Sequence, residues 1–281
     1  MLVREYHLRV GAREVVLLEG PEGWGESSPI AGYPCSPRAA RAAAEEAACR
    51  GWPAPLRDAV AVNALVDADG PIDAARLREY PCVKVKVGRH GPADDIRRVS
   101  AVRDAIGPSV ALRIDANGTW DVDVAATVLD RLAPFDIELV EQPVATLDEL
   151  ARLRKLVSIP VAADESIRGV DDARRARKLD AVDAIVLKVQ PLGGVRPALD
   201  VADAAGVPAI VTSMMETSVG LAAGLALACA LPELPYACGL ATVDALDGDV
   251  VAHPLVAEHG MLWRRGVVPD PALLARYEVR S

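Results

Sequence analysis

Five ionisable residues recur at a nearly constant interval through the middle of this 281-residue chain. They are Lys86, Asp115, Glu141, Asp164 and Lys188, and each stands at the end of a short apolar run. One strand-plus-helix unit of an α/β barrel takes roughly 25–30 residues, which is close to their spacing. The five therefore fall at the same point of successive units, the carboxyl end of each strand, where barrel enzymes keep their active sites.

Three of these residues are carboxylates, which would repel one another if they shared one end of a barrel without a cation. Three hard oxygen ligands completed by water suit Mg²⁺, or alternatively Mn²⁺, better than zinc. We therefore predict a divalent metal site formed by Asp115, Glu141 and Asp164. The alternative is three separate structural roles, with Asp115 in a turn before Asn117 and Gly118 and the other two residues beginning helices.

The scarcity of lysine in this chain is a second indication, besides the spacing, that these lysines have a functional role. Only Lys84, Lys86, Lys155, Lys178 and Lys188 occur among 31 basic residues. Lys84 and Lys86 alternate along one strand, so both ammonium groups face the same side. Two close ammonium groups disfavour each other's charge and lower a pKa toward the range useful for a base. A solvated edge strand is the alternative interpretation.

This set of groups suits the abstraction of a proton next to a carboxylate. A metal bound to the carboxylate stabilises the enolate that forms. Lys188 ends a strand four positions round from the Lys84–Lys86 strand, which is the opposite wall of an eight-stranded barrel. One lysine can remove the proton while the other protonates or stabilises the opposite face.

The elements that would position these residues form a repeating pattern of strand and helix. The predicted strands are 59–65, 82–87, 110–114, 137–140, 161–163, 184–189, 209–212 and a weak one at 236–239. The predicted helices between them are 94–106, 121–132, 148–157, 171–179 and 195–205, and a buried helix is expected at 219–231. We predict a TIM-type (β/α)7β barrel. A doubly wound sheet is the runner-up, weakened by the lack of a Gly-x-Gly-x-x-Gly motif after the early strands.

The two ends of the chain differ from this pattern. Residues 2–57 read as strand, strand and helix, with a strand at 14–18, a Gly/Pro-rich loop at 20–29 and a helix at 37–50. We predict an α+β capping domain formed by residues 1–58 with 245–281, and a catalytic barrel domain at 59–244. The loop that contains Trp24 is either a mobile lid or a plain hairpin loop.

Composition excludes several classes of protein. The net charge of -9 argues against a nucleic-acid partner. No apolar stretch reaches the ~18 residues of a membrane span, and no signal-peptide core is present, so a cytoplasmic location is expected. The five scattered cysteines indicate neither a zinc site nor a disulfide framework. Composition leaves the oligomeric state open.

The residues around these positions resemble the enolase superfamily, in the subgroup of muconate cycloisomerases and o-succinylbenzoate synthases. The motifs that carry the resemblance are Lys84-x-Lys86, Asp115-Ala116-Asn117-Gly118, Glu141-Gln142-Pro143, Ala163-Asp164-Glu165-Ser166 and Leu187-Lys188. The resemblance continues through residues 193–194, 216–220 and 235–240, which are most similar to the short o-succinylbenzoate synthases of actinobacteria.

This resemblance implies a hydro-lyase reaction on a small carboxylate, in which 2-succinyl-6-hydroxy-2,4-cyclohexadiene-1-carboxylate loses water to give o-succinylbenzoate for menaquinone synthesis. It implies that Lys86 is the base and then the acid, that Lys188 stabilises the enediolate from the other face, and that Lys84 tunes Lys86. The substrate-binding residues expected with it are Asn117, Ser213, Gly239 and Trp24.

Other activities on the same site remain open, chiefly N-acylamino acid racemisation and muconate cycloisomerisation. Dipeptide epimerisation is disfavoured, because relatives with that activity carry Asp-x-Asp after the strand that here continues into residues 212–216. A non-catalytic barrel is also disfavoured, because all three carboxylates and both lysines are present.

Overall fold

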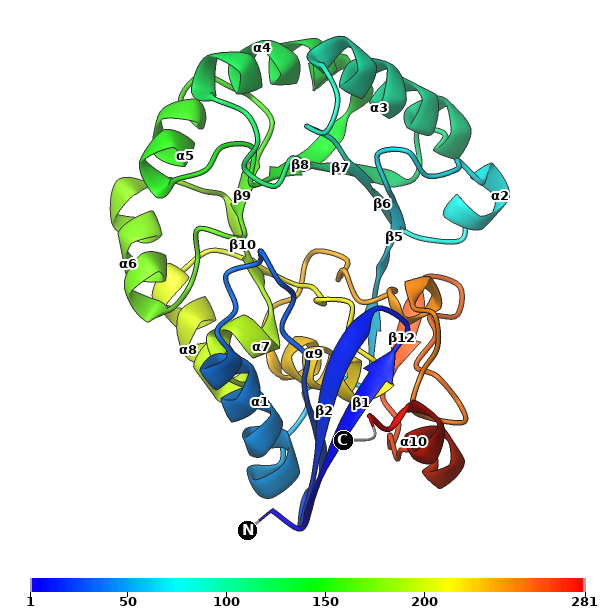
Figure 1. Ribbon diagram of the computed structural model, residues 1–281. Coiled ribbons are helices and arrows are strands. Elements are labelled where there is room, and N and C mark those ends of the chain that lie inside the picture. The colour runs from blue at the N-terminus through cyan, green and yellow to red at the C-terminus, as the bar shows by residue number, and fades with distance from the viewer. Residues whose placement is uncertain (1, 280–281) are drawn as a thin grey trace.

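The computed structural model describes residues 2–279 and has an α/β architecture built on a curled parallel sheet (Figure 1). The strands of this sheet follow the order β11-β10-β9-β8-β7-β6-β5. Their bounds are β5 (Asn63–Val66), β6 (Cys82–Lys86), β7 (Ala111–Asp115), β8 (Ile137–Glu141), β9 (Val161–Ala163), β10 (Ala184–Leu187) and β11 (Ala209–Val211). Neighbouring strands along the chain are neighbours in space, as expected for successive strand–helix units.

Helices ring the outer side of this sheet (Figure 1). They are α2 (Ala74–Leu77), α3 (Pro92–Ile106), α4 (Val122–Leu132), α5 (Leu147–Leu153), α6 (Val170–Leu179), α7 (Val189–Leu192), α8 (Val195–Ala205) and α9 (Ser218–Ala230), with 3₁₀ turns at Ala133–Phe135 and Val243–Ala245. The local sequence determines where several of these helices begin. Asp121 caps α4, and Thr146 with Glu149 forms a capping box on α5. The five predicted helices between strands are all present, with ends shifted by a few residues at most.

The pairing register aligns the carboxyl ends of the strands. Lys86 pairs with Asp115, and Asp115 pairs with Glu141. Because side chains alternate across a strand, this register directs these residues to the same side of the sheet. The first three residues of the spaced series therefore lie at one edge.

The segment around Cys238 bridges the two edges of the sheet. Cys238 pairs with Val62 beside β5, and Gly239 pairs with Thr212 beside β11. A Cβ atom at Gly239 would lie 2.8 Å from Thr212 Cγ2, so a side chain does not fit there. The predicted weak strand at 236–239 is present as these isolated bridges and not as a regular strand.

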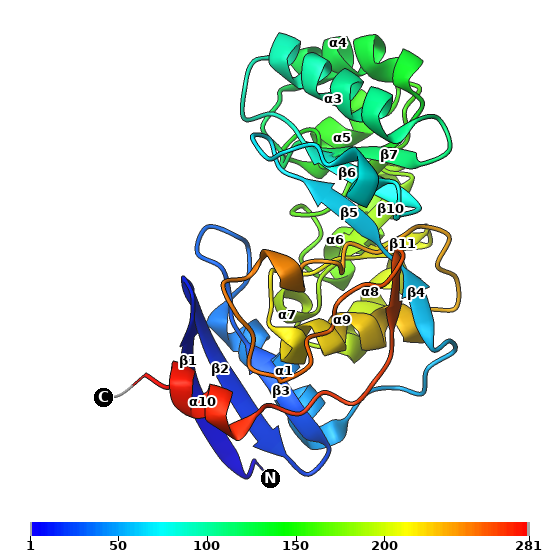
Figure 2. The same cartoon turned by 90° about the vertical axis from the view of Figure 1, so that its right-hand side faces the viewer.

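The N-terminal part forms a second, antiparallel sheet with one long helix. The sheet contains β1 (Arg4–Val10), β2 (Arg13–Gly20) and β3 (Gly23–Ser27), and α1 (Pro37–Arg50) packs on it (Figure 2). Glycine is required at Gly25, because a Cβ there would collide with the backbone carbonyl of Ala44 on α1. The predicted loop at 20–29 is therefore largely strand, since residues 23–27 find hydrogen-bonding partners on β2.

The C-terminal part runs back along both regions (Figure 2). Strand β12 (Met261–Trp263) pairs with β4 (Ala59–Ala61), and α10 (Pro271–Tyr277) packs near β1. The predicted strand at 59–65 is thus two strands, because its first half pairs with β12 and its second half joins the parallel sheet.

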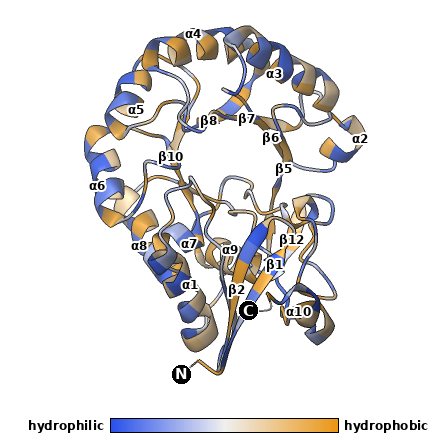
Figure 3. Ribbon diagram, viewed as in Figure 1, coloured by the Kyte–Doolittle hydropathy of each residue, from blue (hydrophilic) through white to orange (hydrophobic). Residues whose placement is uncertain are grey.

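The hydrophobic core fills the space between the parallel sheet and its helices. The strands of this sheet are accordingly mostly apolar (Figure 3). The predicted buried helix is α9, which is buried along nearly its whole length. Across residues 2–279, none of the helices combines the length and the hydrophobicity needed to cross a membrane.

Candidate active site

A cavity of about 280 Å³ lies at the carboxyl ends of the parallel strands. Its wall contains residues from both halves of the sheet and from the bridging segment. They are Asn63, Leu65, Asp67, Lys84, Lys86, Asp115, Glu141, Lys188, Thr212, Ser213, Met215, Gly239, Ala241 and Thr242. Lys84 and Lys86 on β6 and Lys188, directly after β10, all line this cavity. Figure 1 shows β6 and β10 on opposite sides of the curled sheet.

One ion-pair network links β6, β7 and β8. Lys84 Nζ donates to Asp115 Oδ2 at 3.1 Å and to Glu141 Oε2 at 2.9 Å. Lys86 Nζ donates to the same Asp115 oxygen at 2.6 Å and to Asn117 Oδ1 at 2.9 Å. Asp115 is therefore held between two ammonium groups, and Lys86 is the more exposed of the two lysines.

A second network links β9, β10 and the N-terminal part. Lys188 Nζ donates to Asp164 Oδ2 and, at 3.0 Å, to the hydroxyl of Tyr33. Tyr33 in turn donates to Asp164 Oδ1 at 2.8 Å. The Lys188 ammonium also lies 4.2 Å from the centre of the Tyr33 ring, within cation–π range.

Burial and neighbouring charge shift the pKa values of these groups in different directions. Burial raises the pKa of Glu141 to about 7, and the negative charge of Asp115 adds to the effect. For Asp115, burial is outweighed by the ammonium groups of Lys84 and Lys86, which lower the pKa of the carboxyl. For Lys84, burial is outweighed by Glu141 and Asp115, which raise the pKa of the amine. The expectation that adjacent lysines would lower a pKa therefore does not apply to Lys84, because two carboxylates hold it charged.

The chemistry of the donor set fits a hard divalent cation. Glu141 Oε1 is buried and has no hydrogen-bond partner within the described part of the chain, so it is free to act as a ligand. Asp115 ends β7 and Asp164 directly follows β9, the strands on either side of β8, and both supply further carboxylate oxygens. Over residues 2–279, no three such side chains already converge as a metal cluster, and the lysine ammonium groups pair with Asp115 and Asp164.

The four predicted substrate-binding residues have different positions. Ser213 and Gly239 line the active-site cavity. Asn117 contacts Lys86 and donates to Glu165 Oε1 at 2.9 Å, beside the cavity. Trp24 lies elsewhere, because β3 carries it against Tyr6 with 5.4 Å between the ring centres. The structure does not bring Trp24 to the site.

Several cavity or network residues were not predicted, among them the polar residues Tyr33, Asn63 and Thr212. Asn63 Oδ1 and Thr212 Oγ1 are buried on the cavity wall without a hydrogen-bond partner among the described residues, so they are available to a ligand. Both are polar residues within otherwise apolar strand segments, and this pattern could have identified them from the sequence. Tyr33 had no such signal, because only the tertiary fold brings it to Lys188.

The loop after β11 adopts a strained conformation on the cavity wall. Met215 has a φ of 59°, which is uncommon for a residue other than glycine. Glu216 accepts a hydrogen bond from the Met214 amide at 2.5 Å, and Arg13 donates to the Met214 carbonyl at 3.4 Å. The loop is therefore held by a contact within itself and by a contact from the N-terminal sheet.

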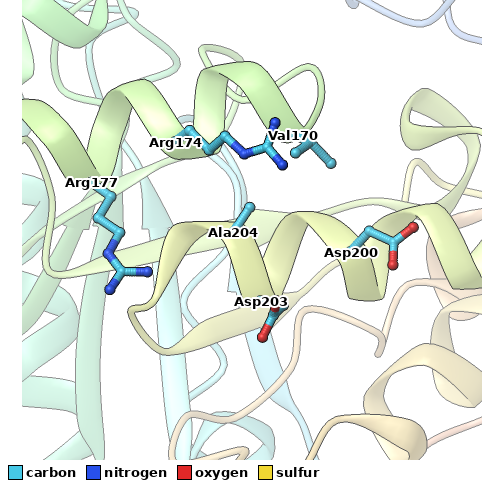
Figure 4. A pocket seen from close by; sticks show the side chains of 6 residues that line it. All are labelled: Val170, Arg174, Arg177, Asp200, Asp203 and Ala204. Carbon is cyan, nitrogen blue, oxygen red and sulfur yellow. The ribbon is translucent and has the colours of Figure 1, made fainter.

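A larger hollow of about 500 Å³ lies on the outer surface between α6 and α8 (Figure 4). Its wall has two arginines, Arg174 and Arg177, facing two aspartates, Asp200 and Asp203. These charges balance, and none of the predicted site residues lines it. The smaller cavity at the strand ends is therefore the candidate active site.

Comparison with known proteins agrees with this geometry. Residues 58–270 match the family model described as enolase C-terminal domain-like, and residues 8–48 match the enolase N-terminal domain-like model. Muconate cycloisomerase from Pseudomonas fluorescens has a similar fold, with a TM-score of 0.87, 24% identity and coverage of 100% of this chain and 98% of that chain. The fold and the strand-end site thus define an enolase-type α/β enzyme.

Relatives that are similar in sequence identify a narrower family within this class of enzymes. The o-succinylbenzoate synthase of Thermobifida fusca is 54% identical over 96% of this chain and 87% of that protein. That of Mycolicibacterium smegmatis is 45% identical over 95% of this chain and 84% of that protein. The chain belongs to the enolase superfamily and, within it, to the family of the o-succinylbenzoate synthases. The predicted family, and with it the prediction of an enzyme, is confirmed.

Proposed function

We propose that this chain catalyses the syn dehydration of 2-succinyl-6-hydroxy-2,4-cyclohexadiene-1-carboxylate to o-succinylbenzoate, a step of menaquinone synthesis. The observation that carries the proposal is the placement of Lys86 and Lys188 on opposite sides of one cavity, each beside a carboxylate. The identity to relatives named o-succinylbenzoate synthase supports the same reaction.

In this proposal Lys86 is the base. It removes the proton next to the ring carboxylate and then gives a proton to the departing hydroxyl on the same face, so that water leaves. Lys86 is suited to this because its amine is partly exposed to the cavity. Lys188 acts from the opposite face, where its positive charge stabilises the negative charge that develops on the substrate. Lys84 holds Asp115 and Glu141 in position.

We propose that Asp115, Glu141 and Asp164 hold a divalent cation, most suitably Mg²⁺ and alternatively Mn²⁺. The support is their position on three neighbouring strand ends and the unpartnered Glu141 Oε1. When bound, the metal supplies Lewis-acid stabilisation of the substrate carboxylate. Members of the enolase superfamily bind divalent metal ions, usually Mg²⁺, which agrees with this donor set.

The architecture that we propose is a closed (β/α)7β barrel with a capping domain. The bridges from Cys238 and Gly239 to both sheet edges support closure, with residues 236–239 as the eighth strand. The separate antiparallel sheet with α1 supports a capping domain of residues 1–58 and 245–281, against a barrel at 59–244. The C-terminal part contacts both regions, because β12 pairs with β4 and α10 packs near β1.

The direct test is to incubate the pure protein with the cyclohexadiene substrate and Mg²⁺ and to follow the ultraviolet absorbance as the ring becomes aromatic. We expect turnover by the protein and loss of most of it in Asp164→Asn, which should stay folded because asparagine keeps the shape of the side chain and an oxygen that can still accept a hydrogen bond. N-acylamino acid racemisation should be assayed in parallel, since both lysines could serve it. Absence of turnover by the folded protein with Mg²⁺ would refute the proposed dehydration.

A further inference from the structure

The loop before α1 contributes a side chain to the site. The backbone amide of Tyr33 donates to the Ile30 carbonyl at 3.3 Å, and Gly32 has a φ of 84°, so a tight turn directs Tyr33 toward the barrel. Ser36 then caps α1 immediately afterwards. Tyr33 is half-buried, and its hydroxyl lies between Lys188 and Asp164.

This loop has a firm attachment to the element that carries Lys188. Helix α1 packs against α7, which begins directly after Lys188. Glu46 on α1 accepts from the Val195 amide at 2.6 Å and from the Arg196 guanidinium at 2.8 Å, at the start of α8. Tyr33 and Lys188 are therefore held relative to each other by backbone packing on both sides, and not merely by their own contact.

The geometry points to Tyr33 as a positioning residue that fixes the direction of the Lys188 amine across the cavity. Its hydroxyl accepts from Lys188 and donates to Asp164, while its ring covers the ammonium group at 4.2 Å. A lysine side chain has four rotatable bonds, so its amine needs such contacts to hold one position. The inference rests on the proposed role of Lys188, and it makes the site dependent on the N-terminal part of the chain.

The matched variants are Tyr33→Phe, which keeps the ring, Tyr33→Ala, which removes both contacts, and the control Tyr6→Phe. Tyr6 also lies in the N-terminal part, but its hydroxyl donates to Glu19 at 3.2 Å, away from the cavity. With the metal-loaded enzyme, we expect Tyr33→Phe to lower kcat at least about tenfold and to change KM by less than about threefold. Tyr6→Phe should change neither constant by more than about twofold.

A double-mutant cycle separates positioning from a purely structural role. If Tyr33 acts through Lys188, the loss caused by Tyr33→Phe should shrink to about threefold or less when Lys188 is already arginine. Equal losses in both backgrounds would show that Tyr33 does not act through Lys188 and would overturn the inference.

A second readout does not depend on the activity. Trace acetylation followed by mass spectrometry measures the reactivity of Lys188 against the exposed Lys155 and Lys178. We expect Lys188 to become several-fold more reactive in Tyr33→Phe, and more so in Tyr33→Ala, while Tyr6→Phe matches the original chain. Unchanged reactivity in both Tyr33 variants would refute the positioning role. If the original chain fails to dehydrate the substrate, the proposed function fails, and the acetylation result still decides the role of Tyr33.

Discussion

At the scale of single residues, the two lysines that we propose as catalytic have unequal surroundings. Lys86 has 27% of its side chain exposed and contacts Asp115 and Asn117, whereas Lys188 has 11% exposed and is held by Asp164 and Tyr33. A group that exchanges protons with a substrate needs access and freedom to move, and a group that supplies fixed charge needs neither. The surroundings therefore match the different roles proposed for the two lysines.

Replacement of Lys86 by alanine should abolish dehydration. The expected loss of kcat is about 10³-fold or more, within or above the usual range for a general acid–base residue. The fold should persist, because Lys84 still pairs with both Asp115 and Glu141. Ultraviolet assays and circular dichroism measure the two effects. The surface variant Lys155→Ala serves as control, and a loss below about tenfold in Lys86→Ala would contradict the assignment of the base.

Replacement of Lys188 by arginine separates fixed charge from proton transfer. Arginine keeps the charge but does not give up its proton, since its pKa exceeds ~12. Lys188→Arg should therefore keep some dehydration and lose N-acylamino acid racemisation entirely. The larger guanidinium also displaces the substrate ring and so lowers both activities. The ratio of the two losses is therefore the diagnostic quantity. Equal losses with substrate still bound would indicate that Lys188 transfers a proton in both reactions.

At the scale of elements, a buried carboxylate joins β3 to the start of α9. Glu26 accepts hydrogen bonds from the Ser28 hydroxyl at 2.6 Å, from the Thr217 and Gly220 amides at 3.2 and 2.9 Å, and from the Thr217 hydroxyl. These contacts link the N-terminal sheet to the loop that carries Ser213 and Met215. Burial nevertheless raises the pKa of Glu26 to about 7 from 4.5.

This shift predicts a pH dependence of stability. Between about pH 4.5 and pH 7 the folded chain keeps a proton on Glu26 that the unfolded chain releases, so the Glu26 contribution to stability falls as pH rises. Glu26→Gln removes that contribution. The unfolding free energy of the variant relative to the original chain should therefore rise from pH 5 to pH 8, by an amount on the order of 3 kcal/mol. Denaturant titrations at several pH values measure it, and parallel curves for the two proteins would refute it.

The elements also show where sequence could and could not predict the fold. The strand–helix repeat was predictable, because apolar runs ending in a polar residue recur at the length of one unit. The first of the two predicted N-terminal strands was given no bounds, because residues 4–10 are rich in charge, and β3 was missed, because residues 23–27 contain glycine and tryptophan in a loop-like context. Their strand character comes from pairing with β2. Because residues 20–29 read as a loop, Trp24 was predicted to be near the substrate. Tyr33 was not predicted, because only the tertiary fold brings it to Lys188.

At the scale of the whole molecule, metal binding should stabilise the folded chain. A ligand that binds only the folded state adds about 2.7 kcal/mol at 100 times its dissociation constant. We expect the melting temperature to rise with Mg²⁺ concentration in the original chain and to respond far less in Glu141→Gln. Differential scanning fluorimetry with Mg²⁺, and with Ca²⁺ as a comparison, measures the effect. An equal response in both proteins would argue against a metal bound at Glu141.

The two bridges from Cys238 and Gly239 also bear on how the molecule folds. The other strand pairs of the parallel sheet join consecutive units, so each can form soon after its own helix. The bridge between Val62 and Cys238 joins residues separated by nearly the whole parallel sheet, so forming it closes a very long loop at a high entropic cost. This seam should therefore form last during folding and exchange its amide hydrogens first, so the cavity wall at Gly239 is completed only when the rest of the parallel sheet is in place.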